Sequence, residues 1–209
     1  MAARAKLDFG GFPCPTVEDL DVAHDIYVER ESRDVFDRAA AKLMKLARTR
    51  SAKADAAAVL LLTWNARYFR LHPERRHTLL ADLGELIHGH AACLNGYRAR
   101  GIRSLQEYEG ANVEALFADF QDTLGPVGTA KTLHLLAPKF FPLWDTKIRE
   151  AYGVASKRPE RHPCCYWRFM LITRSQVDAV GGQTGVGRNP VKALDEYNYA
   201  KFTLRASGL

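Results

Sequence analysis

The chain has 209 residues, of which 47% are hydrophobic and 26% are charged. This composition is that of an ordinary globular protein, and it excludes the disordered, collagenous and membrane-embedded classes. The length is enough for one sizeable domain with its own hydrophobic core. Thirty Lys and Arg residues against 24 Asp and Glu give a formal net charge of +6, which favours a polyanionic partner.

Neither a membrane span nor a metal site is expected. The longest apolar run, Ala56 to Leu62, is far shorter than the roughly 18 residues that cross a bilayer, and Met1 to Pro15 lacks the apolar region of a signal peptide. We therefore expect an intracellular, cytoplasmic and nucleoid-associated protein, and a monomer. The cysteines show no zinc-ligand spacing, so we expect reduced thiols at all four: Cys14, Cys93, Cys164 and Cys165.

The first half of the chain predicts three amphipathic helices. Apolar residues recur at spacings of three and four over 33–48, 54–71 and 79–94, and Gly96 is the expected stop of the third helix. The middle one is apolar on nearly every side, so it is expected to be the buried central helix. Residues 1–32 are taken as an N-terminal extension of a single domain over 33–209.

The second half predicts further helices separated by turn signals. Ser104 and Glu107 have capping-box spacing, so a short helix is expected there, ending at Gly110. The remaining expected elements are helices over 113–120, 129–137, 146–152, 166–180 and 190–204, with Asp145 or Thr146 and then Asn189 as starts, Gly153 as a stop, and a glycine-rich loop over 181–187. No strand alternation of useful length occurs, so the fold class is all-α, with about eight helices.

The stretch from Leu124 to Arg149 reads LGPVGTAKTLHLLAPKFFPLWDTKIR and carries most of the chemical information. A helix leads into a glycine hairpin, and the next helix opens with free backbone N–H groups that can hold a phosphate. Lys131 lies one turn into that second helix. Asp145 follows an extended segment at the start of another helix, so a cation and a carboxylate are expected to converge.

These residues resemble the helix-hairpin-helix DNA glycosylase superfamily, which includes endonuclease III and the 8-oxoguanine DNA glycosylases. Leu-Gly-Pro-Val-Gly at 124–128 is similar to the family hairpin, Leu-Pro-Gly-Val-Gly, with two residues exchanged. The segment ending Phe-Pro-Leu-Trp-Asp145 resembles the one that ends in the family's catalytic Asp. Residues 58–65 are similar to the family's early buried helix, which ends in a Gln or Asn, here Asn65. The resemblance covers 54–153, about half of the chain.

The resemblance implies a multi-helix, glycosylase-like domain that cleaves the N-glycosidic bond of a damaged or modified base flipped out of duplex DNA. Asp145 would stabilise the positive charge on the sugar, and Lys131 would act as a Schiff-base nucleophile in a bifunctional enzyme with lyase activity. Lys131 stands three residues after Gly128, whereas the family lysine stands two after its glycine.

The resemblance also implies a set of binding residues. The implied DNA-binding residues are Gly125, Val127, Gly128, Thr129 and Asn65, and the implied base pocket consists of Trp64, Tyr68 and Trp144. No cofactor is expected, because the four-cysteine spacing of an iron–sulfur cluster is absent.

Structural interpretations stand beside each of these roles. Asp145 is also a natural helix N-cap, Lys131 a solvated helix residue, and Trp64 and Trp144 packing residues; His134 is expected to have no chemical role. The same fold would also suit a phage-type DNA base-modifying enzyme or a non-catalytic nucleic-acid-binding protein. The third alternative is an unrelated all-α regulator or assembly protein.

Overall fold

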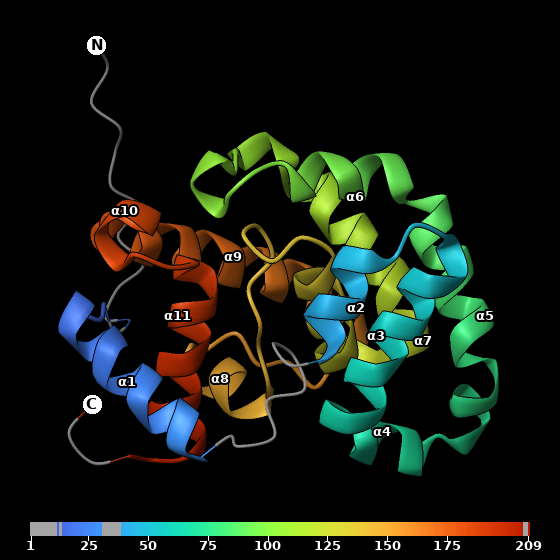
Figure 1. The fold of residues 1–209 in the computed structure, drawn as a ribbon, viewed down its shortest axis with the longest axis horizontal. Helices are drawn as coiled ribbons and strands as arrows, with labels where there is room; N and C mark the ends of the chain where they lie inside the picture. Colours follow the sequence, from blue (N-terminus) through green and yellow to red (C-terminus); the bar gives the residue numbers. More distant parts are fainter. Residues whose placement is uncertain (1–11, 13, 31–38, 207–208) are drawn as a thin grey trace.

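The computed structural model describes residues 12, 14–30, 39–206 and 209 of the chain (Figure 1). Most of these residues are helical and no strand occurs among them, which confirms the all-α fold class. The α-helices are α1 (Val17–Arg30), α2 (Ala41–Leu46), α3 (Arg50–Trp64), α4 (Ala66–Leu71), α5 (Pro73–Gly89), α6 (Ala91–Arg98), α7 (Gly110–Leu136), α8 (Thr146–Ala151), α9 (His162–Ala179), α10 (Gly182–Val186) and α11 (Pro190–Asn198). Short 3-10 turns lie at Ile102–Ser104, Glu107–Glu109 and Pro159–Arg161, and a π-helical turn at Tyr199–Thr203 follows α11.

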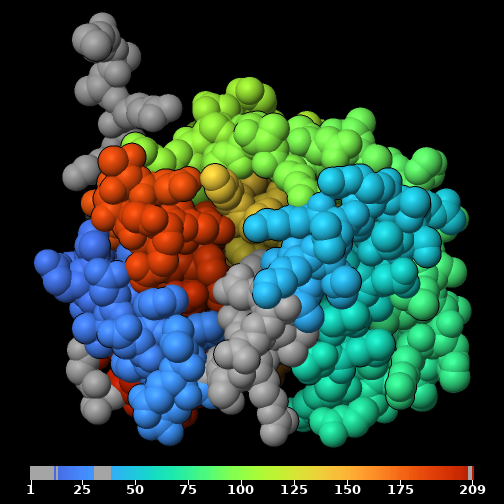
Figure 2. Space-filling model, viewed as in Figure 1, coloured from blue at the N-terminus to red at the C-terminus, as the bar shows by residue number. Residues whose placement is uncertain are grey.

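The two ends of the described chain meet on one side of the molecule. Helix α1 packs against α11, and α10 lies above them, whereas α2 to α5 form the opposite side (Figure 1). In Figure 2 the blue N-terminal helix and the orange-red C-terminal helices stand beside each other, and a gold strip of chain from the segment after α7 shows between them and the cyan helices. The N-terminal helix is therefore part of the packed fold, with Leu20, Ala23 and Tyr27 buried.

Helix α7 and the segment after it supply much of the core. Helix α7 packs against α3, α5 and α9. The residues that carry this packing are large and fully buried, and several are aromatic: Phe117, Phe120, Phe140, Phe141, Trp144, Tyr152, Tyr166 and Phe169. Phe117 stacks on Tyr166 with ring centroids 4.4 Å apart, and Trp144 meets Tyr166 edge to face at 5.0 Å. Aromatic contacts of this kind fix the position of the segment that ends at Asp145.

Two helices that the sequence pattern predicts as continuous are broken. The predicted 54–71 helix ends as α3 at Trp64 and restarts as α4, because Asn65 has φ −124° and ψ 23°. The predicted 79–94 helix is interrupted at His90, which has φ −102° and ψ 12°, and α6 then runs through Gly96 to Arg98. The prediction that Gly96 stops this helix was wrong, since an isolated glycine costs a helix only about 1 kcal/mol.

The prediction around Ser104 was also wrong in detail. The capping box forms between Gln106 and Glu109, two residues later than predicted, and Arg100 pairs with Glu109 at 2.6 Å. Gly110 caps the end of the 3-10 turn Glu107–Glu109, as predicted for a short helix there, and it is also the first residue of α7. A Cβ at Gly110 would lie 3.1 Å from the Trp167 ring, so this glycine permits a close approach of α9.

Other boundaries agree with the sequence pattern. Asp145 caps α8 and Asn189 caps α11, each through a side-chain oxygen that accepts a backbone N–H, and Gly153 has φ +59° just beyond α8. The predicted loop over 181–187 contains the short helix α10 between two glycines of positive φ. The start of the predicted 33–48 helix lies outside the described residues, and its described part forms a π turn and α2. None of the described helices has the length and apolarity needed to cross a membrane.

Candidate active site

The glycine hairpin forms within α7. Gly125 has φ +67° and ψ 168°, a backbone conformation that is essentially restricted to glycine. It kinks the helix just before Pro126, and the hydroxyl of Thr129 donates to the Gly125 carbonyl at 2.8 Å to close the turn. The predicted hairpin is therefore present as a sharp kink between two helical segments.

Tyr68 of α4 and Asn65, the residue just before α4, cover one side of this hairpin. A Cβ at Gly125 would lie 2.8 Å from the Tyr68 ring, and a Cβ at Gly128 would lie 2.9 Å from the Asn65 amide nitrogen. The Tyr68 hydroxyl donates to the Thr123 carbonyl at 3.3 Å. Gly125, Gly128 and Thr129 are consequently buried, and of the predicted hairpin contacts to DNA only Val127 is half-buried.

A cavity of about 390 Å³ opens beside the hairpin. Its lining residues come from α1, the α3–α4 junction, α7, the segment leading into α8, α8 itself, α11 and the π turn: Tyr27, Trp64, Asn65, Val127, Lys131, Leu143, Trp144, Asp145, Thr146, Ile148, Asp195 and Tyr199. Its size falls within the range of small-ligand pockets in proteins. Both predicted catalytic residues, Lys131 and Asp145, line it.

Lys131 reaches the cavity from α7, one turn after the kink. Its Nζ donates to the Trp64 carbonyl at 2.5 Å and lies 5.7 Å from the centroid of the Trp64 ring. Burial lowers the pKa of Lys131 to about 8, although the negative charges of Asp145 and Asp195 act in the opposite direction. A neutral amine is therefore far more accessible here than at a solvated lysine.

Asp145 is the N-cap of α8, as predicted, and its side chain also lines the cavity. One carboxylate oxygen accepts the Ile148 N–H at 2.8 Å and so caps α8, and the other accepts the Thr203 hydroxyl at 3.0 Å. The side chain is only partly buried and lines the cavity. Two hydrogen bonds from different elements thus hold a carboxylate in a fixed orientation at the edge of the site.

The three predicted base-pocket aromatics occupy different places. Trp64 is half-buried and lines the cavity. Trp144 also contributes to the lining, but only 1% of it is exposed, and its Nε1 donates to the Pro126 carbonyl at 3.0 Å. Tyr68 is outside the cavity lining and packs against Gly125 instead. Trp64 is therefore the predicted aromatic residue best placed to contact a ligand.

Asn65, the predicted DNA-inserting residue, lies at the break between α3 and α4. Its amide nitrogen is 3.5 Å from the Leu124 carbonyl, and its side chain contacts the hairpin at Gly128 while lining the cavity. In this arrangement Asn65 joins the hairpin to the cavity wall. Its insertion into a DNA stack stays a prediction.

Four residues of this region were not identified from the sequence: Tyr27, Lys192, Asp195 and Tyr199. Lys192 is buried and lies 4.2 Å from the centroid of the Tyr27 ring; its Nζ donates to Asp195 at 3.1 Å. Burial opposes its charge, but the nearby carboxylates of Asp195 and Glu196 outweigh that effect and raise the pKa of Lys192. The signal in the sequence is the i, i+3 and i, i+4 spacing of Lys192 to Asp195 and Glu196, which is common on helix surfaces and indicates no site by itself.

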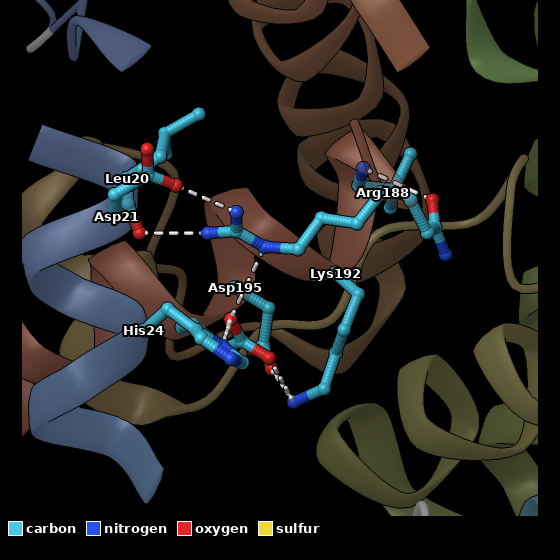
Figure 3. Close-up of polar contacts among 9 residues, drawn as sticks. Leu20, Asp21, His24, Arg188, Lys192 and Asp195 are labelled. Carbon is cyan, nitrogen blue, oxygen red and sulfur yellow. Dashed lines mark hydrogen bonds and ion pairs between the residues drawn. The ribbon is translucent and has the colours of Figure 1, made fainter. Parts of the chain in front are cut away.

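Polar contacts hold α1 against α11 behind this wall of the cavity (Figure 3). Arg188 donates to Asp21 at 2.7 Å and to the Leu20 carbonyl at 2.8 Å, and Nδ1 of His24 lies 2.9 Å from a carboxylate oxygen of Glu196. These contacts join segments about 170 residues apart in the chain. They position Tyr27 and Asp195 on the side of the cavity opposite the hairpin helices.

His134 is buried one turn beyond Lys131, and its Nδ1 lies 2.8 Å from the Phe141 carbonyl. Burial lowers the pKa of His134 to about 3, so the ring is neutral and Nδ1–H donates. It does not line the cavity. Within the described part of the chain, no three His, Cys, Asp or Glu side chains are grouped so that they could hold a metal ion.

No protein-family model matches the chain, and no curated protein or solved structure is significantly similar to it. The functional assignment therefore depends on the geometry of the cavity and on the motifs in the sequence.

Proposed function

We propose that this protein is a DNA glycosylase, which cleaves the N-glycosidic bond of a damaged or modified base that has been flipped out of duplex DNA. The observation that carries the proposal is the position of Lys131 and Asp145 on one cavity, beside a glycine hairpin. Burial lowers the pKa of Lys131 to about 8, which is the direction that a lysine nucleophile requires.

In the proposed reaction the flipped base enters the cavity and stacks on Trp64. The C1′–N bond breaks, the electron pair leaves with the base, which takes up a proton, and positive charge develops on the sugar. The fixed carboxylate of Asp145 stabilises this charge. The neutral amine of Lys131 forms a bond to C1′, and after proton loss and opening of the sugar ring an imine joins the lysine to the sugar.

A non-catalytic nucleic-acid-binding role is the second candidate. One observation favours it: both oxygens of Asp145 already accept hydrogen bonds, and the Lys131 amine already donates to the Trp64 carbonyl. In that case the two residues would stabilise the hairpin and α8. Their charges would then be dispensable for binding.

The Asp145→Asn substitution separates these two functions. Asn is also a good N-cap, so the variant keeps the acceptor for the Ile148 N–H while losing the charge. We expect single-turnover base release from duplexes carrying 8-oxoguanine or uracil to fall by about 10²- to 10³-fold, with DNA affinity unchanged. Lys147→Gln, which alters an exposed charge two residues away, is the control and should release the base at the wild-type rate. If the wild-type protein binds DNA and releases no base, the binding role is supported.

A further inference from the structure

The junction of α4 and α5 carries a cluster of positive charges. Four arginines occur within ten residues, Arg67 and Arg70 on α4 and Arg75 and Arg76 in the first turn of α5, and all four are exposed. Against the single acidic residue Glu74 they give a net charge of +3 over residues 65–77, which is half of the +6 of the whole chain. We call these four residues the arginine patch.

The four patch arginines have no ion-pair partner among the described residues, a feature that they share with other exposed arginines such as Arg98 and Arg168. No carboxylate of the described residues lies within ion-pair distance of any of its four guanidinium groups, and Glu74 pairs with His72. Elsewhere arginines from several elements pair with acids: Arg50 with Glu85, Arg100 with Glu109, Arg103 with Asp178, and Arg188 with Asp21. Among the described residues, no acidic side chain neutralises the charges of the patch.

Two of these arginines also occupy positions that are unfavourable for their helix. Arg75 and Arg76 lie in the first turn of α5, where the helix dipole favours negative side chains and disfavours positive ones. A feature that opposes local stability is most often found where function requires it.

The arginine patch adjoins the cavity and the hairpin. Asn65, which lines the cavity, is two residues before Arg67. Tyr68 of α4 contacts Gly125 of the hairpin, and Arg75 is near enough to the Tyr68 hydroxyl to act against its burial-raised pKa. On α4 the arginines lie three residues apart, a spacing that places their Cβ atoms about 5–6 Å from each other.

We infer that the arginine patch binds the phosphate backbone of duplex DNA beside the nucleotide that enters the cavity. The inference deepens the proposed function and rests on it for the choice of DNA as the polyanion. Exposed guanidinium groups suit phosphates, to which they donate two hydrogen bonds at once. In this arrangement the patch supplies affinity and register, and the cavity supplies selectivity for the base.

Two double variants and a matched control test the inference. Arg67→Gln/Arg70→Gln and Arg75→Gln/Arg76→Gln each remove two charges from the patch. Arg98→Gln/Arg168→Gln removes two exposed charges from α6 and α9, which lie well away from α4 in Figure 1. The measurement is the dissociation constant for a duplex carrying an abasic-site analogue, determined at several salt concentrations.

Each patch variant should bind the duplex more weakly, and the slope of log K against log salt should become shallower by about 2, or roughly 0.9 for each lost phosphate contact. The control should keep the wild-type slope. Arg75→Gln/Arg76→Gln should also raise the thermal midpoint of unfolding, because it removes cations from the start of α5. Arginines with a purely structural role would lower it.

Unchanged slopes in both patch variants, or an equal loss in the control, would overturn the inference, as would the absence of any duplex binding by the wild-type protein. Base release at saturating DNA keeps this result separate from the proposed function. If no protein releases a base but the patch variants still lose slope, the patch stands as a DNA-binding surface and the glycosylase proposal fails.

Discussion

The side chain of Lys131 combines a structural bond with an unusual protonation equilibrium. Burial lowers its pKa from 10.5 to about 8. Between these two values the unfolded chain binds more protons at this site than the folded one, so the contribution of Lys131 to stability rises with pH across this window. The folded protein therefore tolerates an energetic cost at neutral pH, as proteins commonly do at functional residues.

Gly125 is the residue on which the hairpin most depends, and its replacement is a direct test. Gly125→Ala adds a Cβ 2.8 Å from the Tyr68 ring and forces alanine into a glycine-only backbone region. We expect it to lower the free energy of unfolding by about 3 kcal/mol or more, since backbone strain and overpacking each contribute about 1–3 kcal/mol. Chemical denaturation of the purified variant gives this value.

Gly187→Ala is the matched control for this prediction. Gly187 also has a positive φ, of +73°, but a Cβ there would meet nothing within 4 Å. Gly187→Ala should lower the free energy of unfolding by about 1–2 kcal/mol, because it adds only the strain of the left-handed conformation. Equal losses in the two variants would show that the contact with Tyr68 is of no consequence.

At the scale of helices, the sequence predicted the capping residues at helix starts correctly, but it did not predict where a long helix is interrupted. Asp145 and Asn189 act within a few residues as caps, so their roles follow from the sequence, and both were confirmed. The break at Asn65 was not predicted, because it depends on contact between its amide and the hairpin, 59 residues away. Helix α1 was missed, although its buried residues Leu20, Ala23 and Tyr27 have helical spacing. Its packing depends on contacts with α11 at the other end of the chain.

The same limit explains what the sequence revealed of the site. Lys131 and Asp145 are close in sequence and share a recognisable motif, so they were identified together. Tyr27 and Asp195 reach the cavity only through the packing of α1 against α11, for which no local pattern exists. This part of the cavity wall is thus a property of the tertiary structure.

Substitution of Asn189, the N-cap of α11, measures how much this cap stabilises the helix that carries Asp195. Asn189 accepts the Val191 N–H at 3.2 Å and donates to the Pro138 carbonyl at 2.9 Å. Asn189→Ala removes both hydrogen bonds and should lower the free energy of unfolding by about 1–3 kcal/mol. Asn189→Asp keeps the cap and should lose less in the same denaturation experiment. If Asn189→Asp lowered the free energy of unfolding more than Asn189→Ala does, the role of Asn189 as an N-cap would be contradicted.

For the molecule as a whole, the fold brings three parts of the chain to one cavity. The hairpin helix supplies Lys131, the segment before α8 supplies Asp145, and the pair of terminal helices closes the opposite side. The arginine patch lies beside this cavity on the outer surface, so DNA contact and chemistry would share one region. A covalent enzyme–DNA intermediate at Lys131 is the strongest consequence of this arrangement.

Borohydride trapping on duplexes carrying 8-oxoguanine, uracil or an abasic site, followed by peptide mapping, tests that consequence most directly. We expect an adduct located at Lys131 that is absent from Lys131→Ala. Its rate of formation should rise with pH up to about 8, because the neutral amine is the nucleophile. An adduct that persists in Lys131→Ala, or none on any of the three duplexes, would contradict the assignment of Lys131 as the nucleophile.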